Sequence, residues 1–364
     1  MNNIGSLSLK QVFVIKGIAI IMIVLHNYVH SISGIGENEM NFNSSILPDL
    51  INNIKNNPSV LLTGLFSYLG HFGVQLFIFV SGYGLTKKYM ADEDINFKKY
   101  ILTRIVKVYS LLIFGLLILF FGTILIESKE QIIFFPKDAL RTLLMLNNFS
   151  YDKLYSFVGP WWFFGLIIQL YFIFTLMLKI IKRFKSKGFY LLLFISFLSI
   201  YLLFPFTESL GFPLFANLPG HLPEFILGIA AAMFIFRINY KWFICGVFVF
   251  ILANMSKYFF PLSFLSITIV LLFITTYILN LPKENYLIKA FRFIGEISMF
   301  IFVINGPLRK VTLWPFSGED INHLLLFGGA IVHTLVTIIA AYIMSIIYKK
   351  SVIPVSKKVL SHFT

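Results

Sequence analysis

The chain has 364 residues, of which 58% are apolar and only 13% are charged. Soluble domains are roughly half apolar and a quarter charged, so this composition, with a mean hydropathy of +0.85, excludes an ordinary globular protein. A formal charge of +14 would favour nucleic acid as a partner in a soluble protein, but these cations lie between long apolar runs. Membrane orientation accounts for them, and no nucleic acid is expected. The single cysteine, Cys245, excludes an intrachain disulfide.

Apolar runs long enough to cross a bilayer recur along the chain. A hydrocarbon core about 30 Å thick requires about 20 mostly apolar residues in a helix. The runs lack the period-2 alternation of strands, so we predict an all-α membrane protein in contact with the lipid bilayer. Ten spans are expected, of which the sixth and seventh are short and interrupted by prolines: Leu9–His30, Val60–Leu85, Tyr100–Ile126, Trp161–Ile181, Phe189–Phe206, Leu222–Phe236, Trp242–Asn254, Pro261–Asn280, Ile294–Trp314 and His323–Tyr348.

The positions of the cations predict the orientation. With the N-terminus inside and ten alternating spans, most of the 30 Lys and Arg residues fall on the inner side, and every inner loop carries some of them. The positive-inside rule predicts this bias, so both termini are expected in the cytoplasm. The two long outer connections, 31–59 and 127–160, are polar and carry many of the acids. Residues 1–364 are expected to form one membrane domain with no fused soluble domain.

The first span carries ionisable groups, which are costly at membrane depth and therefore indicate function. Lys16 is either an anchor that reaches the inner headgroups or a contact to a phosphate-bearing ligand from the cytoplasm. His26 lies about 15 Å above it, near mid-membrane, and His30 lies one turn higher on the same face, with Asn27 beside them. A neutral imidazole is a natural general base. A histidine pair also suits a metal, but no Cys, Asp or Glu completes a ligand set on this helix, so no metal is expected.

Polar groups also mark the second and third spans. Gln75 and Ser81 lie within the second span, where they either line a cavity or bond to a neighbouring helix. His71 is a further polar group in the outer half of that span. The following loop and the start of the third span form a basic inner patch that includes Arg104 and Lys107. Either anionic lipid or the diphosphate of a nucleotide or CoA would match such a patch.

Three later positions complete the candidate site. Trp162 opens the fourth span, where the interfacial aromatic belt is expected. Glu224 follows His221 by three residues and either favours the helix dipole or contacts a histidine or a sugar hydroxyl. Asn305 precedes Gly306 and Pro307 in the ninth span, and broken polar backbone at depth usually lines a cavity.

Six segments, in this order, resemble membrane acyltransferase family 3 (acyltransferase 3), and the resemblance covers nearly the whole chain. It implies ten transmembrane helices in the bacterial cytoplasmic (inner) membrane, acetyl-CoA as the donor on the cytoplasmic side, and cell-surface carbohydrate as the acceptor. The segments are KGIAIIMIVLH, GVQLFIFVSGYGL, RIVKVY, WWFFGLIIQLYF, LPEFILGI and ISMFIFVINGPL.

Two positions depart from the family pattern. The family usually places histidine eleven residues after the basic residue of the first span, where this chain has Asn27, with His26 one position earlier and His30 three later. The base is therefore expected to be His26, with His30 as the alternative. The family's ninth-span motif often ends in histidine, where this chain has Asn305.

The resemblance predicts an acetyl-CoA-dependent O-acetyltransferase that needs no metal. Lys16, Arg104 and Lys107 would hold the CoA phosphates, and a histidine of the first span would take the proton of the acceptor hydroxyl. Ser81, Gln75 or Asn305 would donate to the oxyanion, and Glu224 and Trp162 are candidate contacts to the sugar. The alternatives are a transporter or flippase for a glycan intermediate and a catalytically silent member of the family. The oligomeric state is not predicted.

Overall fold

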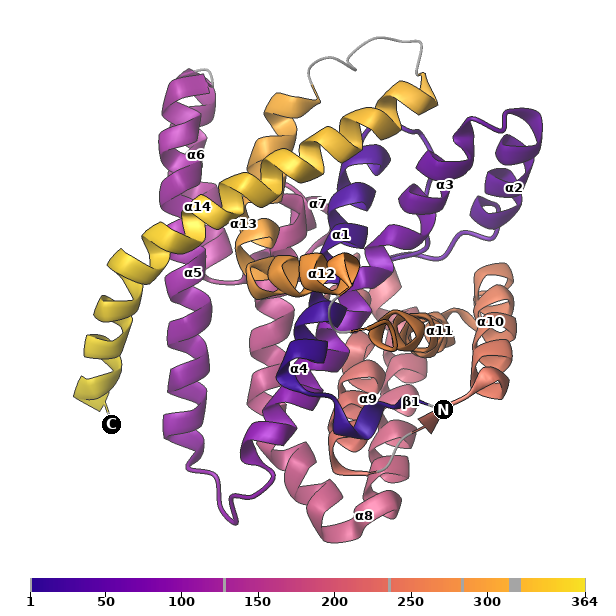
Figure 1. Cartoon of the computed structure of the whole chain (residues 1–364), viewed down its shortest axis with the longest axis vertical. Coiled ribbons are helices and arrows are strands. Elements are labelled where there is room, and N and C mark those ends of the chain that lie inside the picture. Colours follow the sequence, from indigo (N-terminus) through magenta and orange to yellow (C-terminus); the bar gives the residue numbers. More distant parts are fainter. Residues whose placement is uncertain (1, 127–128, 235–236, 283–284, 314–321, 364) are drawn as a thin grey trace.

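The computed structural model describes residues 2–126, 129–234, 237–282, 285–313 and 322–363, and most of these are helical (Figure 1). The described strands are two residues long each, β1 (Asn2–Asn3) and β2 (Arg237–Ile238), which pair antiparallel. The predicted all-α class is confirmed.

The elements follow one another along the chain with short connections. The α-helices are α1 (Leu9–His30), α2 (Ile46–Asn56), α3 (Val60–Leu69), α4 (Gly73–Tyr89), α5 (Phe97–Ile126), α6 (Lys129–Leu143), α7 (Tyr151–Leu154), α8 (Trp162–Ser209), α9 (Leu222–Met233), α10 (Tyr240–Met255), α11 (Ser263–Leu279), α12 (Tyr286–Glu296), α13 (Ser298–Thr312) and α14 (His323–Phe363). The 3-10 turns are η1 (Ile4–Ser6), η2 (Gly70–Phe72), η3 (Leu146–Phe149), η4 (Gly159–Trp161), η5 (Leu214–Ala216), η6 (Leu218–His221) and η7 (Phe260–Leu262).

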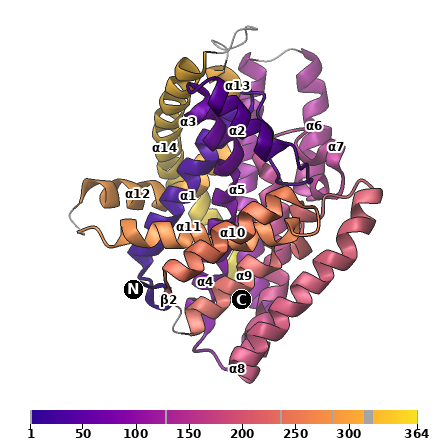
Figure 2. The same ribbon diagram turned by 90° about the vertical axis from the view of Figure 1, so that its right-hand side faces the viewer.

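Six helical segments of the described chain are long and apolar enough to cross a membrane, which makes this a multi-pass membrane protein. The fourth and fifth predicted spans lie in one of these segments, the long helix α8, which bends at Lys185, a non-glycine residue with φ of 52°. Figure 2 shows the two arms of α8. The apolar α9 and α10 are shorter. The count of ten spans and the cytoplasmic termini therefore stay predictions. The six segments are Leu9–His30, Val60–Tyr89, Phe97–Ile124, Gly159–Ser209, Phe260–Leu279 and His323–Ser361.

Two of the predicted spans are interrupted. The second consists of α3 and α4 with the tight turn η2 between them, and this turn carries His71. In the ninth, α12 ends at Glu296 and α13 begins at Ser298. Such breaks at depth are tolerated where the freed backbone groups are buried in protein or face a cavity.

Close helix contacts place α1 and α4 at the centre of the molecule (Figure 1). A Cβ at Gly17 of α1 would clash with the carbonyl group of Phe291 on α12. A Cβ at Gly82 of α4 would likewise clash with the carbonyl oxygen of Phe225 on α9. Small residues at such crossings let the backbones approach closely, which is how apolar helices associate within lipid.

The outer helices α8, α10 and α14 expose large apolar side chains. Leu202 of α8, Phe248 of α10 and Ile339 of α14 are each at least 60% exposed. In a soluble protein such a surface would be an aggregation hazard, whereas facing lipid it costs nothing. Since other helices enclose the middle of α1 and α4, polar groups such as His26 and Gln75 lie inside the protein, whereas Lys10, Lys87 and Lys88 near the helix ends are exposed.

Candidate functional site

A cavity of about 430 Å³ lies at the C-terminal end of α1. Its walls come from α1, the connection after it, η2, the segment before α8, the start of α8 and α13. Under the predicted orientation this is the outer half of the membrane. The polar residues of its lining are His26, Asn27, His30, Ser31, Glu37, Glu39, His71, Tyr155, Ser156, Trp162, Arg309 and Lys310.

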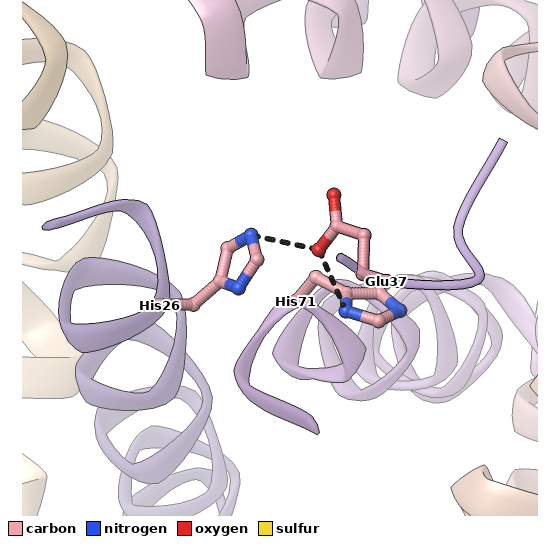
Figure 3. Close-up of side chains that lie close together, drawn as sticks. All are labelled: His26, Glu37 and His71. Carbon is pink, nitrogen blue, oxygen red and sulfur yellow. Dashed lines mark ion pairs between the residues drawn. The ribbon is translucent and has the colours of Figure 1, made fainter. Parts of the chain in front are cut away.

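His26 is held by the end of α3. Its Nδ1 atom lies 3.2 Å from the carbonyl oxygen of Phe66 and 3.0 Å from that of Ser67. Because carbonyl oxygens only accept hydrogen bonds, Nδ1 carries a hydrogen and donates it. These carbonyls belong to the last turn of α3, where the helix gives way to η2, and the oxygen of Phe66 also accepts from the backbone N–H of Gly70. The other ring nitrogen, Nε2, points toward Glu37 (Figure 3).

Glu37 comes from the connection between α1 and α2 and joins two helices at one oxygen. Its Oε2 atom lies 3.1 Å from Nε2 of His26 and 3.2 Å from Nδ1 of His71 (Figure 3). Neither approach has hydrogen-bond geometry: within the described chain, Oε2 and both ring nitrogens of His71 have no hydrogen-bond partner. Burial acts to raise the pKa of the Glu37 carboxyl, but the charges of the surrounding histidines outweigh it and lower that pKa to about 2.

His30 presents a nitrogen to the cavity. Its Nδ1 atom lies 2.9 Å from Oγ of Ser67, and that hydroxyl donates to the carbonyl oxygen of Ile35 at 2.8 Å. With its hydrogen used there, Ser67 accepts from His30, so Nδ1 of His30 carries the proton and Nε2 carries a lone pair. The side chain is 34% exposed, and Nε2 lies 3.7 Å from Oε1 of Glu37.

A second acid lies near the cluster. The hydroxyl of Tyr155 donates to Oε2 of Glu39 at 3.0 Å. Burial, followed by the negative charge of Glu37, raises the pKa of Glu39 to about 7. Burial and the same two carboxylates hold the pKa of Tyr155 well above its ordinary value. The cavity therefore holds two carboxyls whose pKa values are shifted in opposite directions, that of Glu37 downward and that of Glu39 upward.

Asn27 is tied to the opposite wall by its backbone and not by its side chain. Its carbonyl oxygen accepts from a terminal nitrogen of Arg309 at 2.6 Å. Its side-chain Nδ2 is buried and has no hydrogen-bond partner in the described structure. Asn27 is among the residues that line the cavity, and its amide has a hydrogen available for a further hydrogen bond. Trp162 also lines the cavity, with its ring stacked against that of His221, centroids 6.1 Å apart.

The other residues predicted for the acceptor and the oxyanion do not line this cavity. Asn305 is buried and its side-chain oxygen accepts from Nε2 of His333 on α14 at 2.8 Å. Gln75 and Glu224 are fully buried in the helix bundle, and the nearest charged partner of Glu224 is His221 at 3.8 Å. Ser81 is half-buried on α4. The structure thus brings together His26, Asn27, His30 and Trp162.

The predicted cationic residues do not share one site either. The guanidinium of Arg104 lies among the rings of Tyr89, Tyr100 and Tyr171, donating to the hydroxyl of Tyr89 at 3.2 Å. The ammonium of Lys16 lies 5.8 Å from the centre of the Phe13 ring.

Only Lys107, of the three predicted cations, lines a described cavity. This second cavity of about 360 Å³ lies between α5, α13 and α14, and Lys357 also lines it. A small apolar gap of about 10 Å³ shares Phe163 and Phe302 with the lining of the first cavity and Met299 with that of the second. The side chains of this gap therefore lie between the two linings.

Glu37, Glu39 and Tyr155 are not among the residues that the sequence analysis selects. Each lies in an outer connection, where acids are expected in any case, and nothing periodic marks them. A polar loop that follows directly on a helix carrying two deep histidines is the one signal that points to Glu37.

Comparison with known proteins assigns the whole bundle to one family. Residues 10–348 match the family model acyltransferase 3, described as an acyltransferase domain. Neither the curated proteins nor the solved structures contain a match to this chain.

Proposed function

The chain belongs to the acyltransferase 3 family, and from that membership we propose that it is an O-acyltransferase that moves an acyl group, in the first place acetyl, from cytoplasmic acyl-CoA to a hydroxyl of a cell-surface glycan. That it is a membrane acyltransferase follows from the family and from the apolar helices. The donor, the acceptor and the site residues are the proposal, as is the bacterial inner membrane as its location.

The observation that carries the proposal is the lone pair on Nε2 of His30, which faces the cavity beside a carboxylate. An acceptor hydroxyl placed there gives its proton to Nε2. Its oxygen then forms the bond to the acyl carbon, the thioester C–S bond breaks, and the proton passes to the departing CoA thiolate. Glu37, with Oε1 3.7 Å from Nε2, stabilises the imidazolium that forms between these steps.

The exposure of the two rings makes His30 the base in this proposal, with His26 as a positioning residue. The Nδ1 atom of His26 donates to two carbonyls and its side chain is only 6% exposed, whereas the side chain of His30 is 34% exposed. A proton acceptor needs a nitrogen that the substrate can reach. The sequence argument favours His26 by its proximity to the family's position, and mutation of each histidine decides between them.

Stabilisation of the oxyanion is assigned to Asn27. Asn27 lines the same cavity as His30 and its Nδ2 has no hydrogen-bond partner among the described residues, so this amide would be free to donate to the carbonyl oxygen as negative charge develops there.

The donor is proposed to enter from the inner end of the bundle. Lys107 and Lys357 line the second cavity and would hold CoA phosphates there, with Lys16 and Arg104 nearer the inner surface adding positive charge. For the pantetheine arm to reach the first cavity, the side chains around the apolar gap beside Met299, whose volume is about 10 Å³, would have to move apart. This route would let a cytoplasmic donor meet an outer acceptor within one bundle.

The test is transfer of label from radiolabelled acetyl-CoA to glycan in membranes that contain the full chain. We expect labelled glycan with the wild type and a background level with His30→Ala. Consumption of the labelled acetyl-CoA without any label in glycan would reject glycan as the acceptor class. Glycan that crosses the membrane without any label would instead favour the transporter reading, and no activity of either kind would favour a catalytically silent member.

A further inference from the structure

His26, Glu37 and His71 converge on one buried point at the base of the cavity (Figure 3). One ligand atom from each lies within 4.8 Å of the other two. The shared oxygen of Glu37 lies 3.1 Å from one ring nitrogen and 3.2 Å from the other. Both imidazoles are almost fully buried, and the glutamate side chain is 15% exposed.

These three groups do not satisfy one another. Nδ1 of His26 donates its hydrogen to the carbonyls of α3, which leaves a lone pair on Nε2. That lone pair faces a carboxylate oxygen at 3.1 Å, and the two repel unless a cation lies between them. The same oxygen and both nitrogens of His71 lack hydrogen-bond partners in the described chain. Buried polar atoms without partners need an explanation, and a missing ion is one.

We propose that His26, Glu37 and His71 bind a divalent metal ion of the zinc class. Two imidazoles and one carboxylate are a ligand set of catalytic zinc sites, which leave a fourth position open. With bonds of about 2.0–2.2 Å, adjacent ligand atoms of a tetrahedral zinc site lie about 3.3 Å apart, close to the two separations found here. A shared proton would join only two of these three ligand atoms, whereas a metal ion could bind all three.

The surroundings of His26 match those of a metal ligand. Ligating histidines usually donate their second ring hydrogen to a carbonyl or carboxylate, which fixes the ring and its tautomer. The carbonyl oxygens of Phe66 and Ser67 do this for His26. All three proposed ligands line the cavity, so the open position of the ion would face a bound molecule, and an oxygen of that molecule is the ligand expected there.

His30 is not part of the proposed metal site. Its Nε2 is 3.7 Å from the other oxygen of Glu37, and its Nδ1 is bonded to Ser67. The proposed base is therefore not a metal ligand, although the two oxygens of Glu37 lie near both. The metal site goes beyond the proposed function, and the proposal is the same whichever acyl group the enzyme transfers.

The experiment measures the metal content of the full-length protein, purified in detergent through a tag without histidine and washed free of loosely bound ions. We expect about one zinc per chain in the wild type and in His30→Ala, and less than a tenth of that in His71→Ala and in Glu37→Gln. Each variant must elute as a single species. Replacement of the ion by Co²⁺ should give the visible absorption of a tetrahedral cobalt site in the wild type and lose it in both ligand variants.

Two outcomes would overturn the proposal. One is wild-type protein that holds no zinc and whose unfolding temperature is unchanged by added Zn²⁺, which would make the cluster a protonated histidine–glutamate network. The other is equal zinc in the wild type and in both ligand variants, which would place the ion elsewhere. Neither outcome bears on acyl transfer, since label in glycan is measured separately, so a failed metal site and a failed function are distinguishable.

Discussion

The imidazoles of His26 and His30 are stacked on one face of α1, their centroids 4.9 Å apart, and each directs Nδ1 at Ser67 and Nε2 toward Glu37. They differ in exposure: the side chain of His26 is 6% exposed with Nε2 3.1 Å from the carboxylate, whereas that of His30 is 34% exposed with Nε2 3.7 Å away. A molecule in the cavity therefore reaches His30 more readily than His26.

Replacement of His30 by alanine should abolish most acyl transfer while the protein folds. Removal of a general base typically costs about two to four orders of magnitude in rate. Protein level and elution profile should be unchanged, because this partly exposed ring packs little. Labelled glycan formed per minute is the measurement. Normal transfer by His30→Ala together with none by His26→Ala would return the base to His26.

Asn27→Ala should lower the rate constant for transfer by about two to three orders of magnitude, the usual effect of removing one oxyanion donor. The bond from Arg309 ends on the backbone oxygen of Asn27, so this substitution leaves it in place. The apparent KM for both substrates should change little, because the interaction develops in the transition state. A raised KM with an unchanged kcat would instead make Asn27 a contact to the ground state.

Charge reversal at Lys107 should raise the apparent KM for acetyl-CoA about tenfold or more, since charge-assisted contacts to phosphate are among the stronger hydrogen bonds. The matched control is Lys349→Glu, which makes the same change at an exposed lysine that does not line the second cavity. Initial rates at several donor concentrations supply both constants. Equal KM values in the two variants would remove Lys107 from the donor site.

Gly82→Val should destabilise the bundle by about 1–3 kcal/mol, the usual cost of overpacking, because its Cβ would meet the carbonyl of Phe225 on α9. Gly84→Val is the control two residues along the same helix, where a Cβ would have no neighbour within 4 Å. Thermal unfolding in detergent should show a lower midpoint for Gly82→Val only. Equal midpoints would show that α4 and α9 do not need this close approach.

Much of the fold is predictable because hydrophobic length is a local property. The expected bounds Leu9–His30 coincide with α1, and the third expected span, Tyr100–Ile126, lies within α5. The breaks at η2 and between α12 and α13 are not predicted, because the hydropathy of an apolar segment is the same whether or not the backbone turns within it. The backbone of Lys185 is not helical, so the two arms of α8 correspond to the expected spans Trp161–Ile181 and Phe189–Phe206.

The candidate site was predictable only where a single helix carries it. His26 and His30 stand out because ionisable groups within an apolar run are rare. Glu37 meets them through a connection that folds back over the end of α1, and no pattern in the sequence encodes that approach. No metal is expected from the ligands of α1 alone, because only His26 of the proposed set lies on that helix. Glu37 comes from the connection after α1 and His71 comes from η2. Asn305 was placed in a cavity but pairs with His333, a contact between distant helices.

The ten-span topology gives the last prediction. The exposed Cys245 is replaced by serine, and single cysteines are then introduced at Ser44, in the connection before α2, and at Ser186, beside the bend of α8. A membrane-impermeant maleimide added to intact cells should label Ser44→Cys and should label Ser186→Cys only after the cells are opened. The reason is that residues 183–187 carry a cluster of cations, which the positive-inside rule assigns to the cytoplasm, while the first connection carries few. Labelling of Ser186→Cys in intact cells would mean that α8 does not consist of two spans joined inside. The ten-span count would then be wrong, and the side of the membrane on which the cavity at the end of α1 lies would have to be determined again.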